Sequence, residues 1–220
     1  ISLILIALFL TARAAVGPVH QFDEAYRAQV SAANEALYLP SGEGLAVLSA
    51  GYRNALSHML WFKTISYFGK HFKGDRNYKW LAHMCDLVTT LNPGARHVFE
   101  FGALMLAWEV NQPERSIALL DKAIAAEPEY WRYYYLRGFT TYYFLDNPVA
   151  ASEDFTRAAM CPDAPAFLTS LAAKNMLRAG EDPESAIQFL VEMINNSSDA
   201  TVRAALEKKL RKLKKKLSIK

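Results

Sequence analysis

The sequence predicts an all-α protein built from about four stacked helical hairpins, and three observations lead to this prediction. First, small or apolar residues recur every 35 positions in three columns: Leu81, Ser116, Ala151 and Ala186; Cys85, Leu120, Phe155 and Leu190; Val88, Ala123, Ala158 and Met193. Second, Pro113, Pro148 and Pro183 keep the same interval. Third, 52% of the 220 residues are hydrophobic, enough for a sizeable core. A fixed period of this length is typical of solenoids of helix pairs, which stack because one pair cannot bury its own apolar face.

Residues 1–16 predict a transmembrane anchor. Ile1 to Leu10 contains no charge, and only Thr11 and Arg13 interrupt the apolar character up to Val16. A helix over this stretch would rise about 24 Å, somewhat less than the hydrocarbon layer, and we expect further residues to precede Ile1 and complete the span. A signal peptide, with a cleavage site near residues 12–14, is the alternative. Gly17-Pro18 ends the segment.

Residues 17–56 are predicted to link the anchor to the repeats and to cap them. The stretch 22–37 reads as a helix and 38–44 as a loop. The leucines from Leu45 to Leu60 predict a long or kinked helix that merges with the first repeat.

The repeats occupy residues 57–198, as four pairs of helices. The expected first and second helices of each pair are 57–72 with 78–91, 96–110 with 114–127, 130–145 with 149–160, and 166–179 with 184–194. Pro113, Pro148 and Pro183 fall where second helices begin, a position where the missing N–H is harmless. Asn147 and Asp182 precede two of these prolines and are expected to cap the first turn.

This pattern resembles the tetratricopeptide repeat family. Small residues stand midway along the first helices at Gly69, Gly102, Gly138 and Ala173, and the second helix with Ala151, Phe155 and Ala158 is the cleanest match. The resemblance covers about two-thirds of the chain and implies a right-handed superhelical solenoid with a concave surface for protein partners. It also implies that the small residues allow the two helices of a pair to approach closely.

The carboxyl-terminal segment, residues 199–220, predicts a basic amphipathic helix that caps the last repeat. Leu206, Leu210, Leu213 and Leu217 form one stripe. Residues 207–220 hold eight basic side chains and one acid, so the rest of the chain carries a net charge of −4 although the whole carries +3. Solvated lysines explain this face, and contact with anionic lipid or an acidic partner is the alternative. The acidic body and the lack of aromatics in the tail argue against nucleic acid.

No catalytic, cofactor-binding or metal-binding set is found. Cys85 and Cys161 lie in different repeats, and Cys85 occupies an otherwise apolar column, so we expect a small buried hydrophobic residue there, with a disulfide or a metal as alternatives. The five histidines form no metal-binding pattern. We therefore expect no enzymatic activity and no cofactor.

Two sets of residues are predicted to bind a partner. Counting back six positions from the small residue of each first helix gives Lys63, Arg96, Arg132 and Phe167. The three basic residues would form a strip that favours an acidic peptide, with solvated helix starts as the alternative. The third repeat is rich in aromatics, and only some of them can face its neighbours. Tyr135, Phe139, Tyr142 and Tyr143 are the predicted contacts, with extra core filling as the alternative.

The sequence thus predicts a single-pass membrane protein whose repeat domain lies on the periplasmic or extracytoplasmic side. The expected role is a scaffold or adaptor for a membrane-associated protein partner, as an accessory subunit of a larger membrane complex. The alternative is a chaperone-like assembly factor that holds exported or unassembled proteins.

Overall fold

The computed structural model describes residues 42–49 and 51–217, and all regular secondary structure within these ranges is helical. The helices are α2 (Gly42–Leu48), α3 (Arg53–Lys73), α4 (Leu81–Leu91), α5 (Arg96–Trp108), α6 (Pro113–Ala126), α7 (Trp131–Phe144), α8 (Pro148–Met160), α9 (Phe167–Arg178), α10 (Pro183–Asn196) and α11 (Ala200–Leu217). The all-α prediction is confirmed for the described residues.

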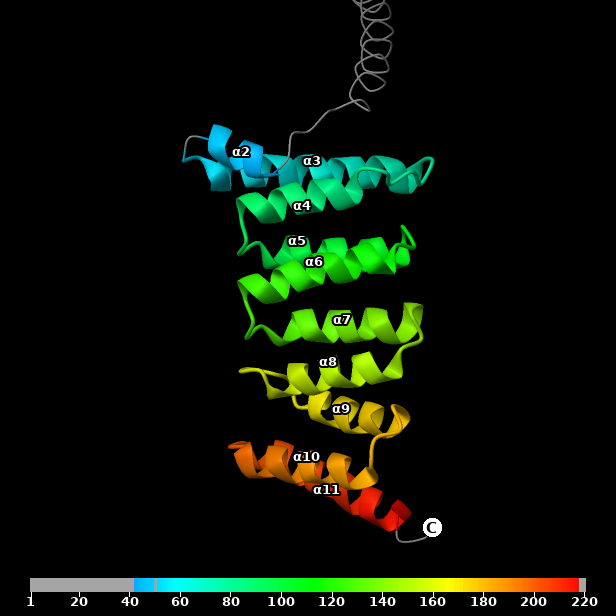
Figure 1. Cartoon of the computed structure of the whole chain (residues 1–220). Helices are drawn as coiled ribbons and strands as arrows, with labels where there is room; N and C mark the ends of the chain where they lie inside the picture. The colour runs from blue at the N-terminus through cyan, green and yellow to red at the C-terminus, as the bar shows by residue number, and fades with distance from the viewer. Residues whose placement is uncertain (1–41, 50, 218–220) are drawn as a thin grey trace, which may run out of the picture. The chain divides into compact units, whose positions relative to one another are not determined.

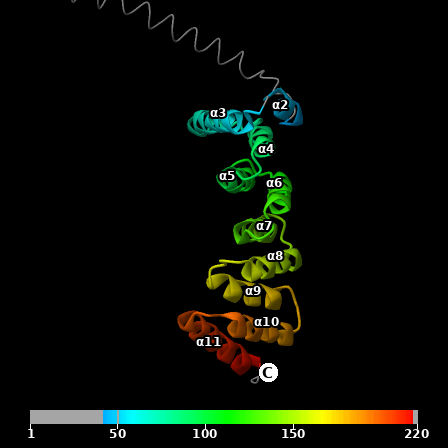
Figure 2. The same cartoon turned by 90° about the vertical axis from the view of Figure 1, so that its left-hand side faces the viewer.

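Each helix from α3 to α11 packs on the next helix along the chain (Figure 1). Beyond these neighbours, α2 packs on α4, α5 on α7 and α9 on α11. Figure 2 shows α3, α5 and α7 in one layer and α4, α6 and α8 in the other. The helices therefore form neighbouring pairs, and from α3 to α8 the first helices lie in one layer and the second helices in the other.

The 35-residue columns form the core between the paired helices. Ten of the twelve residues are fully buried, and Phe155 is 3% exposed. Met193 is the half-buried exception. A second helix thus presents the same face to its neighbours in every pair, which is why the sequence repeats small and apolar residues at this interval.

The helix ends follow the predicted chemistry. Pro113, Pro148 and Pro183 are the first helical residues of α6, α8 and α10. The Asn147 side chain accepts a hydrogen bond from the Ala150 amide, and Asp182 accepts one from the Glu184 amide, both at 3.1 Å. Each side chain satisfies an amide that the first helical turn leaves without a partner.

The turns inside three successive pairs share one backbone feature. Asn111, Asp146 and Gly180 have φ values of 53°, 48° and 82° and precede the proline of the second helix by two or three residues. This left-handed conformation suits glycine, and asparagine and aspartate tolerate it better than other residues. Sequence analysis predicted the role of the prolines but not the left-handed residue that precedes each of them.

The amino-terminal prediction is wrong in two respects. Gly42 to Gly44 were expected in a loop, but they begin α2. The helix expected to run from Leu45 into the first repeat is interrupted, because Gly51 has a φ of 92° and α3 begins only at Arg53. Gly51 is an isolated glycine in a helical pattern, and it marks the point where the helix breaks.

Close approach at the small residues occurs in two of the pairs. A Cβ on Gly102 would lie 2.7 Å from Leu119 Cδ2, and one on Gly138 would lie 2.9 Å from Asp154 Cβ. Gly69, in contrast, has no atom within 4 Å of such a Cβ, so the close approach expected there is wrong. Lys63 was chosen by counting back from Gly69. Because Gly69 does not make the close contact of Gly102 and Gly138, this count no longer supports treating Lys63 as equivalent to Arg96 and Arg132.

The leucine stripe of the carboxyl-terminal segment packs as predicted. Leu206 is buried, and Leu210 and Leu213 are partly buried against the core of α8, α9 and α10. The lysines of α11 are exposed.

The predicted anchor, residues 1–16, and the predicted helix 22–37 lie outside the described residues. Within the described ranges, no helix combines the length and the apolar character needed to cross a bilayer.

Candidate functional site

The candidate site is a surface cluster of aromatic rings on α5, α7 and α9, which we call the aromatic cluster. Its members are Trp108, Tyr135, Phe139, Tyr143 and Phe167. Ring centroids lie 6.1 Å apart for Trp108 and Phe139 and 4.4 Å apart for Phe139 and Tyr143. Tyr135 joins Phe139 at 6.2 Å and Phe167 at 6.0 Å. The rings therefore form one continuous chain of contacts across three first helices.

The helical repeat of α7 creates the middle of this cluster. Tyr135, Phe139 and Tyr143 follow one another at intervals of four residues and so lie along one face. Phe139 and Tyr135 are partly buried, whereas Tyr143 is 62% exposed. Tyr135 and Phe139 thus partly fill the core, as the alternative expected, whereas Tyr143 does not.

Tyr142, the fourth predicted aromatic, lies beside Tyr143 but has a partner of its own. The Arg178 guanidinium donates a hydrogen bond to the Tyr142 hydroxyl at 2.8 Å and lies 5.6 Å from its ring centroid. Tyr142 therefore ties α7 to α9.

Trp108 belongs to the cluster although sequence analysis did not single it out, and Phe167 joins it from the position counted as equivalent to Arg96 and Arg132. They are 55% and 52% exposed and lie at the end of α5 and the start of α9. Their signal in the sequence is weak: each is a large aromatic residue near a helix end and outside the three repeated columns. Only the packing of α5 and α9 beside α7 brings them together with Tyr143.

Two of the three basic residues predicted to line the groove are paired with carboxylates of the chain. Arg132 pairs with Glu100 at 3.2 Å, and Arg96 pairs with Glu127 at 2.6 Å. Lys63 is exposed on α3, a helix that contributes no ring to the cluster. Because two of the three cations already face carboxylates of the chain, their attraction for an acidic partner is reduced.

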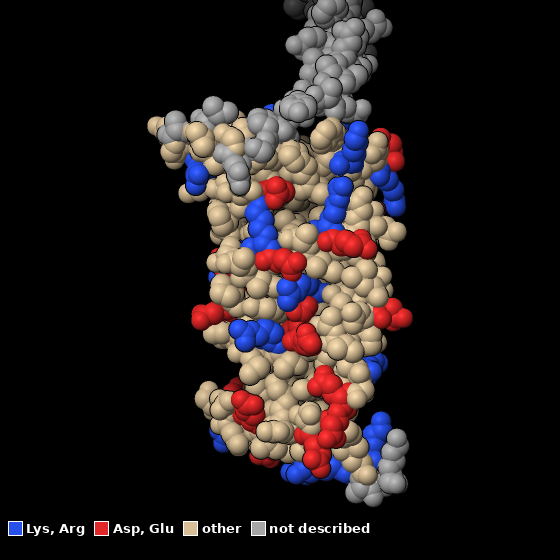
Figure 3. Space-filling model, in the orientation of Figure 1, with Lys and Arg blue, Asp and Glu red and all other residues tan. Residues whose placement is uncertain are grey.

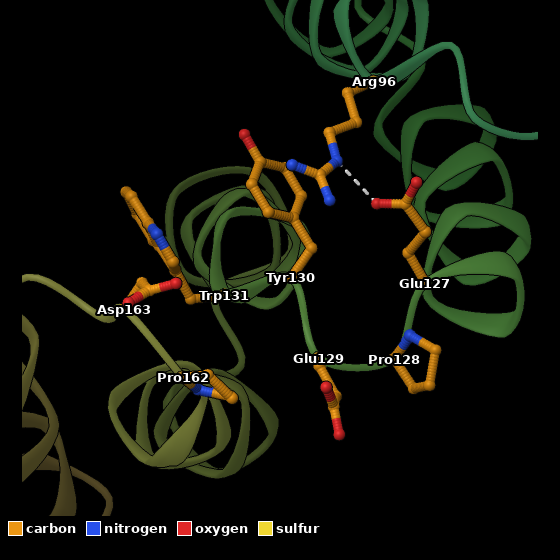
Figure 4. Close-up of a pocket in the computed structure, with 8 residues that line it drawn as sticks. All are labelled: Arg96, Glu127, Pro128, Glu129, Tyr130, Trp131, Pro162 and Asp163. Atoms are coloured by element: carbon orange, nitrogen blue, oxygen red, sulfur yellow. Dashed lines mark hydrogen bonds and ion pairs between the residues drawn. The ribbon is translucent and has the colours of Figure 1, made fainter.

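A pocket of about 560 Å³ adjoins the aromatic cluster (Figure 4). It is lined by Arg96, Glu127, Pro128, Glu129, Tyr130, Trp131, Pro162 and Asp163. These residues come from the start of α5, the connection between α6 and α7, the first residue of α7 and the connection between α8 and α9. The Trp131 ring lies 6.1 Å from Tyr135, so the pocket and the cluster meet on α7.

The wall of this pocket is rigidified by Arg96. Its guanidinium lies 4.3 Å from the Tyr130 ring centroid while its Nε donates to Glu127, as Figure 4 shows. The Tyr130 hydroxyl donates to Glu100 at 2.7 Å, and burial together with this hydrogen bond raises the pKa of Tyr130. Stacking and ion pairing of this arginine hold the start of α5 against the connection between α6 and α7.

Ion pairs link the middle helices on another part of the surface. Figure 3 shows basic and acidic side chains side by side over these helices. Lys122 on α6 pairs with Asp86 on α4, and Arg137 on α7 bridges Asp121 on α6 and Asp154 on α8. These charges stabilise helix contacts and are already matched within the chain.

A smaller pocket of about 310 Å³ lies where α9, α10 and α11 meet. Its floor is apolar, and its rim carries Lys174, Lys209, Lys212 and Lys216. Anionic lipid or an acidic partner at the basic helix α11 remains a prediction.

Both cysteines are free thiols, as expected for a chain without a disulfide framework. Cys85 is fully buried, as predicted, and burial raises its pKa to about 12. Among the described residues, no group of three or more His, Cys, Asp and Glu side chains could hold a metal ion.

The described residues form an all-α protein whose helices pack in neighbouring pairs. No family model matches the chain, and no curated protein matches it either.

Proposed function

We propose that this protein is a helical-repeat scaffold of the tetratricopeptide type that binds a protein partner through the aromatic cluster. The single observation that carries the proposal is the exposure of Trp108, Tyr143 and Phe167 on one continuous surface from three first helices. Exposed aromatic rings are favoured anchors of protein interfaces, since they bring large contact area for little loss of side-chain entropy.

Three further observations support a binding role. The first helices of a right-handed superhelical solenoid line its concave face, and the cluster lies only on first helices. The rings contact one another, so they are already ordered before a partner arrives, which reduces the entropic cost of binding. The pocket beside Trp131 extends this surface and would accommodate a side chain of the partner.

In this proposal residues 1–16 anchor the scaffold in a membrane with the repeats on the extracytoplasmic side. The anchor raises the local concentration of the repeats near a membrane-associated partner. The protein would then act as an accessory subunit of a membrane complex.

Site-specific photocrosslinking tests the proposal. In the native membrane, a photoreactive residue at position 143 should crosslink the protein to its partner and give one adduct of fixed mass. The same residue at position 149 is the control, because Val149 is 53% exposed on α8, outside the cluster. Equal adducts at both positions, or none at 143, would refute binding through the cluster. A heterogeneous ladder of adducts at 143 would instead indicate the chaperone-like assembly factor.

A further inference from the structure

The outward face of α3 is apolar, although it lies at one end of the described helices. Met59 and Phe62 are 64% and 74% exposed, and Ile65 is 39% exposed. Tyr52, just before the helix, is 76% exposed. Met59 and Phe62 point away from Leu60 and Thr64, which are buried on the opposite face. A terminal helix that faces water would not normally carry this many large apolar side chains on its outer surface.

The helix at the opposite end provides the contrast. The outer surface of α11 consists mostly of lysines, while its leucines pack inward. At this end the helix array therefore presents a polar surface to water. It presents an apolar face at the other end.

The charged side chains of α3 itself are all basic. Residues 51–74 contain the basic residues Arg53, Lys63, Lys70 and Lys73 and no acid. The first acid after them, Asp75, is already bonded to His71. Its pKa is lowered, mainly by that hydrogen bond, so it stays ionised beside the imidazole. A surface that combines exposed apolar side chains with basic flanks matches an anionic bilayer surface, where apolar groups enter the headgroup region and cations meet lipid charge.

We propose that the outward face of α3 lies on an anionic lipid surface. Met59, Phe62 and Ile65 enter the interface between headgroups and acyl chains. Lys63 and Lys73 contact the lipid headgroups. Lys63 and Lys73 are exposed on a helix that carries no acid, and an anionic bilayer complements both. This docking is separate from the aromatic cluster, so it goes beyond the proposed function.

An environment-sensitive fluorophore on a single cysteine tests this docking in the full chain. The background is the Cys161→Ser variant, because Cys85 is buried. The probe is placed by Phe62→Cys or, as a matched control, by Tyr143→Cys, since both side chains are largely exposed aromatics. Each protein is mixed with vesicles of phosphatidylcholine alone or of phosphatidylcholine with phosphatidylserine. Doxyl-labelled lipid serves as the quencher.

The expected result is a blue shift and strong lipid quenching at position 62 in the phosphatidylserine vesicles, reversed by high salt. The probe at position 143 should remain exposed to water with both types of vesicle. Lys63→Gln or Lys73→Gln should each lower the ratio of docked to undocked probe about fivefold, because one cation near an anionic surface contributes about 1 kcal/mol. Comparing two positions of the same chain keeps the readout independent of whether residues 1–16 insert.

A probe at position 62 that remains in water in the phosphatidylserine vesicles would overturn the proposal. So would equal quenching at 62 and 143, which would mean unspecific adsorption. Protection of position 62 without vesicles, in the isolated protein, would show that another segment or copy of the chain covers this face instead of lipid.

Discussion

The guanidinium of Arg137 on α7 holds the carboxylate of Asp154 on α8 through three hydrogen bonds, from Nε at 3.2 and 3.0 Å and from Nη2 at 2.6 Å. The Asp154 side chain is only 9% exposed. The Cβ of Asp154 lies against Gly138, where a Cβ added to the glycine would be only 2.9 Å away. Asp154 thus combines a buried charge with a close contact between the two helices.

Removing the arginine should destabilise the fold strongly. Arg137→Met leaves Asp154 buried without its partner, and we expect a loss of about 2–3 kcal/mol in the free energy of unfolding. This is less than for a fully buried pair, because Arg137 is 27% exposed. Asp121→Asn is the control. It removes only the exposed end of the bridge and should cost about 0–1 kcal/mol. Denaturant unfolding of both variants is the measurement, and equal losses would contradict this account.

The destabilisation by Arg137→Met should depend on pH. Burial raises the pKa of Asp154 above its ordinary value, and Arg137 opposes that rise. An acid with a raised folded-state pKa stabilises the fold below its unfolded pKa and loses that contribution as pH rises through the folded value. Without Arg137 the pKa of Asp154 rises further, so the difference between variant and parent should be largest at neutral pH and shrink on acidification. A difference that stays constant from neutral to acidic pH would be the contrary result.

Two glycines should respond to alanine in opposite directions. Gly138→Ala places a Cβ 2.9 Å from Asp154 Cβ and should lose about 1–3 kcal/mol through overpacking. Gly69→Ala meets no atom within 4 Å and should gain up to about 1 kcal/mol from helix propensity. Thermal unfolding followed by circular dichroism measures both. Stabilisation by Gly138→Ala would mean that α7 and α8 are farther apart than described.

Two neighbouring tyrosines should also differ on loss of the hydroxyl. The Tyr133 hydroxyl is buried and has no hydrogen-bond partner among the described residues. Burial raises its pKa. Tyr133→Phe should therefore stabilise the protein by about 1 kcal/mol. Tyr134→Phe loses the hydrogen bond to the Pro128 carbonyl and should destabilise by a similar amount. Chemical denaturation of both variants tests the pair, and a loss with Tyr133→Phe would reveal a partner for its hydroxyl.

The two thiols should report different events during alkylation. Cys85 is fully buried with a pKa raised to about 12, so it should react only when α4 separates from its neighbours. Burial also raises the pKa of Cys161, but its side chain is only partly buried, so it should react first in the folded protein. Mass spectrometry after timed alkylation follows both sites. Faster labelling of Cys85 than of Cys161 in native buffer would contradict the packing of α4.

The repeat pattern predicted most of the helix boundaries because the same physical requirement recurs in each unit. Leu120 and Leu190 must fill the same space between paired helices, and Pro148 or Pro183 fits only the first turn. The amino-terminal helices were harder to predict. Gly51 breaks a pattern that periodicity alone would continue, and Gly69 resembles Gly138 in sequence but faces open space.

The candidate site was predictable only in part. Tyr135, Phe139 and Tyr143 stood out because aromatics crowd one helix, but Trp108 and Phe167 join them through the packing of separate helices. The partners of Arg96 and Arg132 come from other helices, Glu127 at a separation of 31 residues, so their ion pairs left no local signal. Long-range pairing of this kind needs coordinates.

Substantial helix contacts in the described chain join helices no more than two places apart, and this locality has a kinetic consequence. A chain with such low contact order closes only short loops as it folds, so rapid folding is expected without slow assembly of distant segments. Opening can likewise begin at α11 and leave α5 to α8 intact, so amide hydrogen exchange should slow gradually from the ends toward α7.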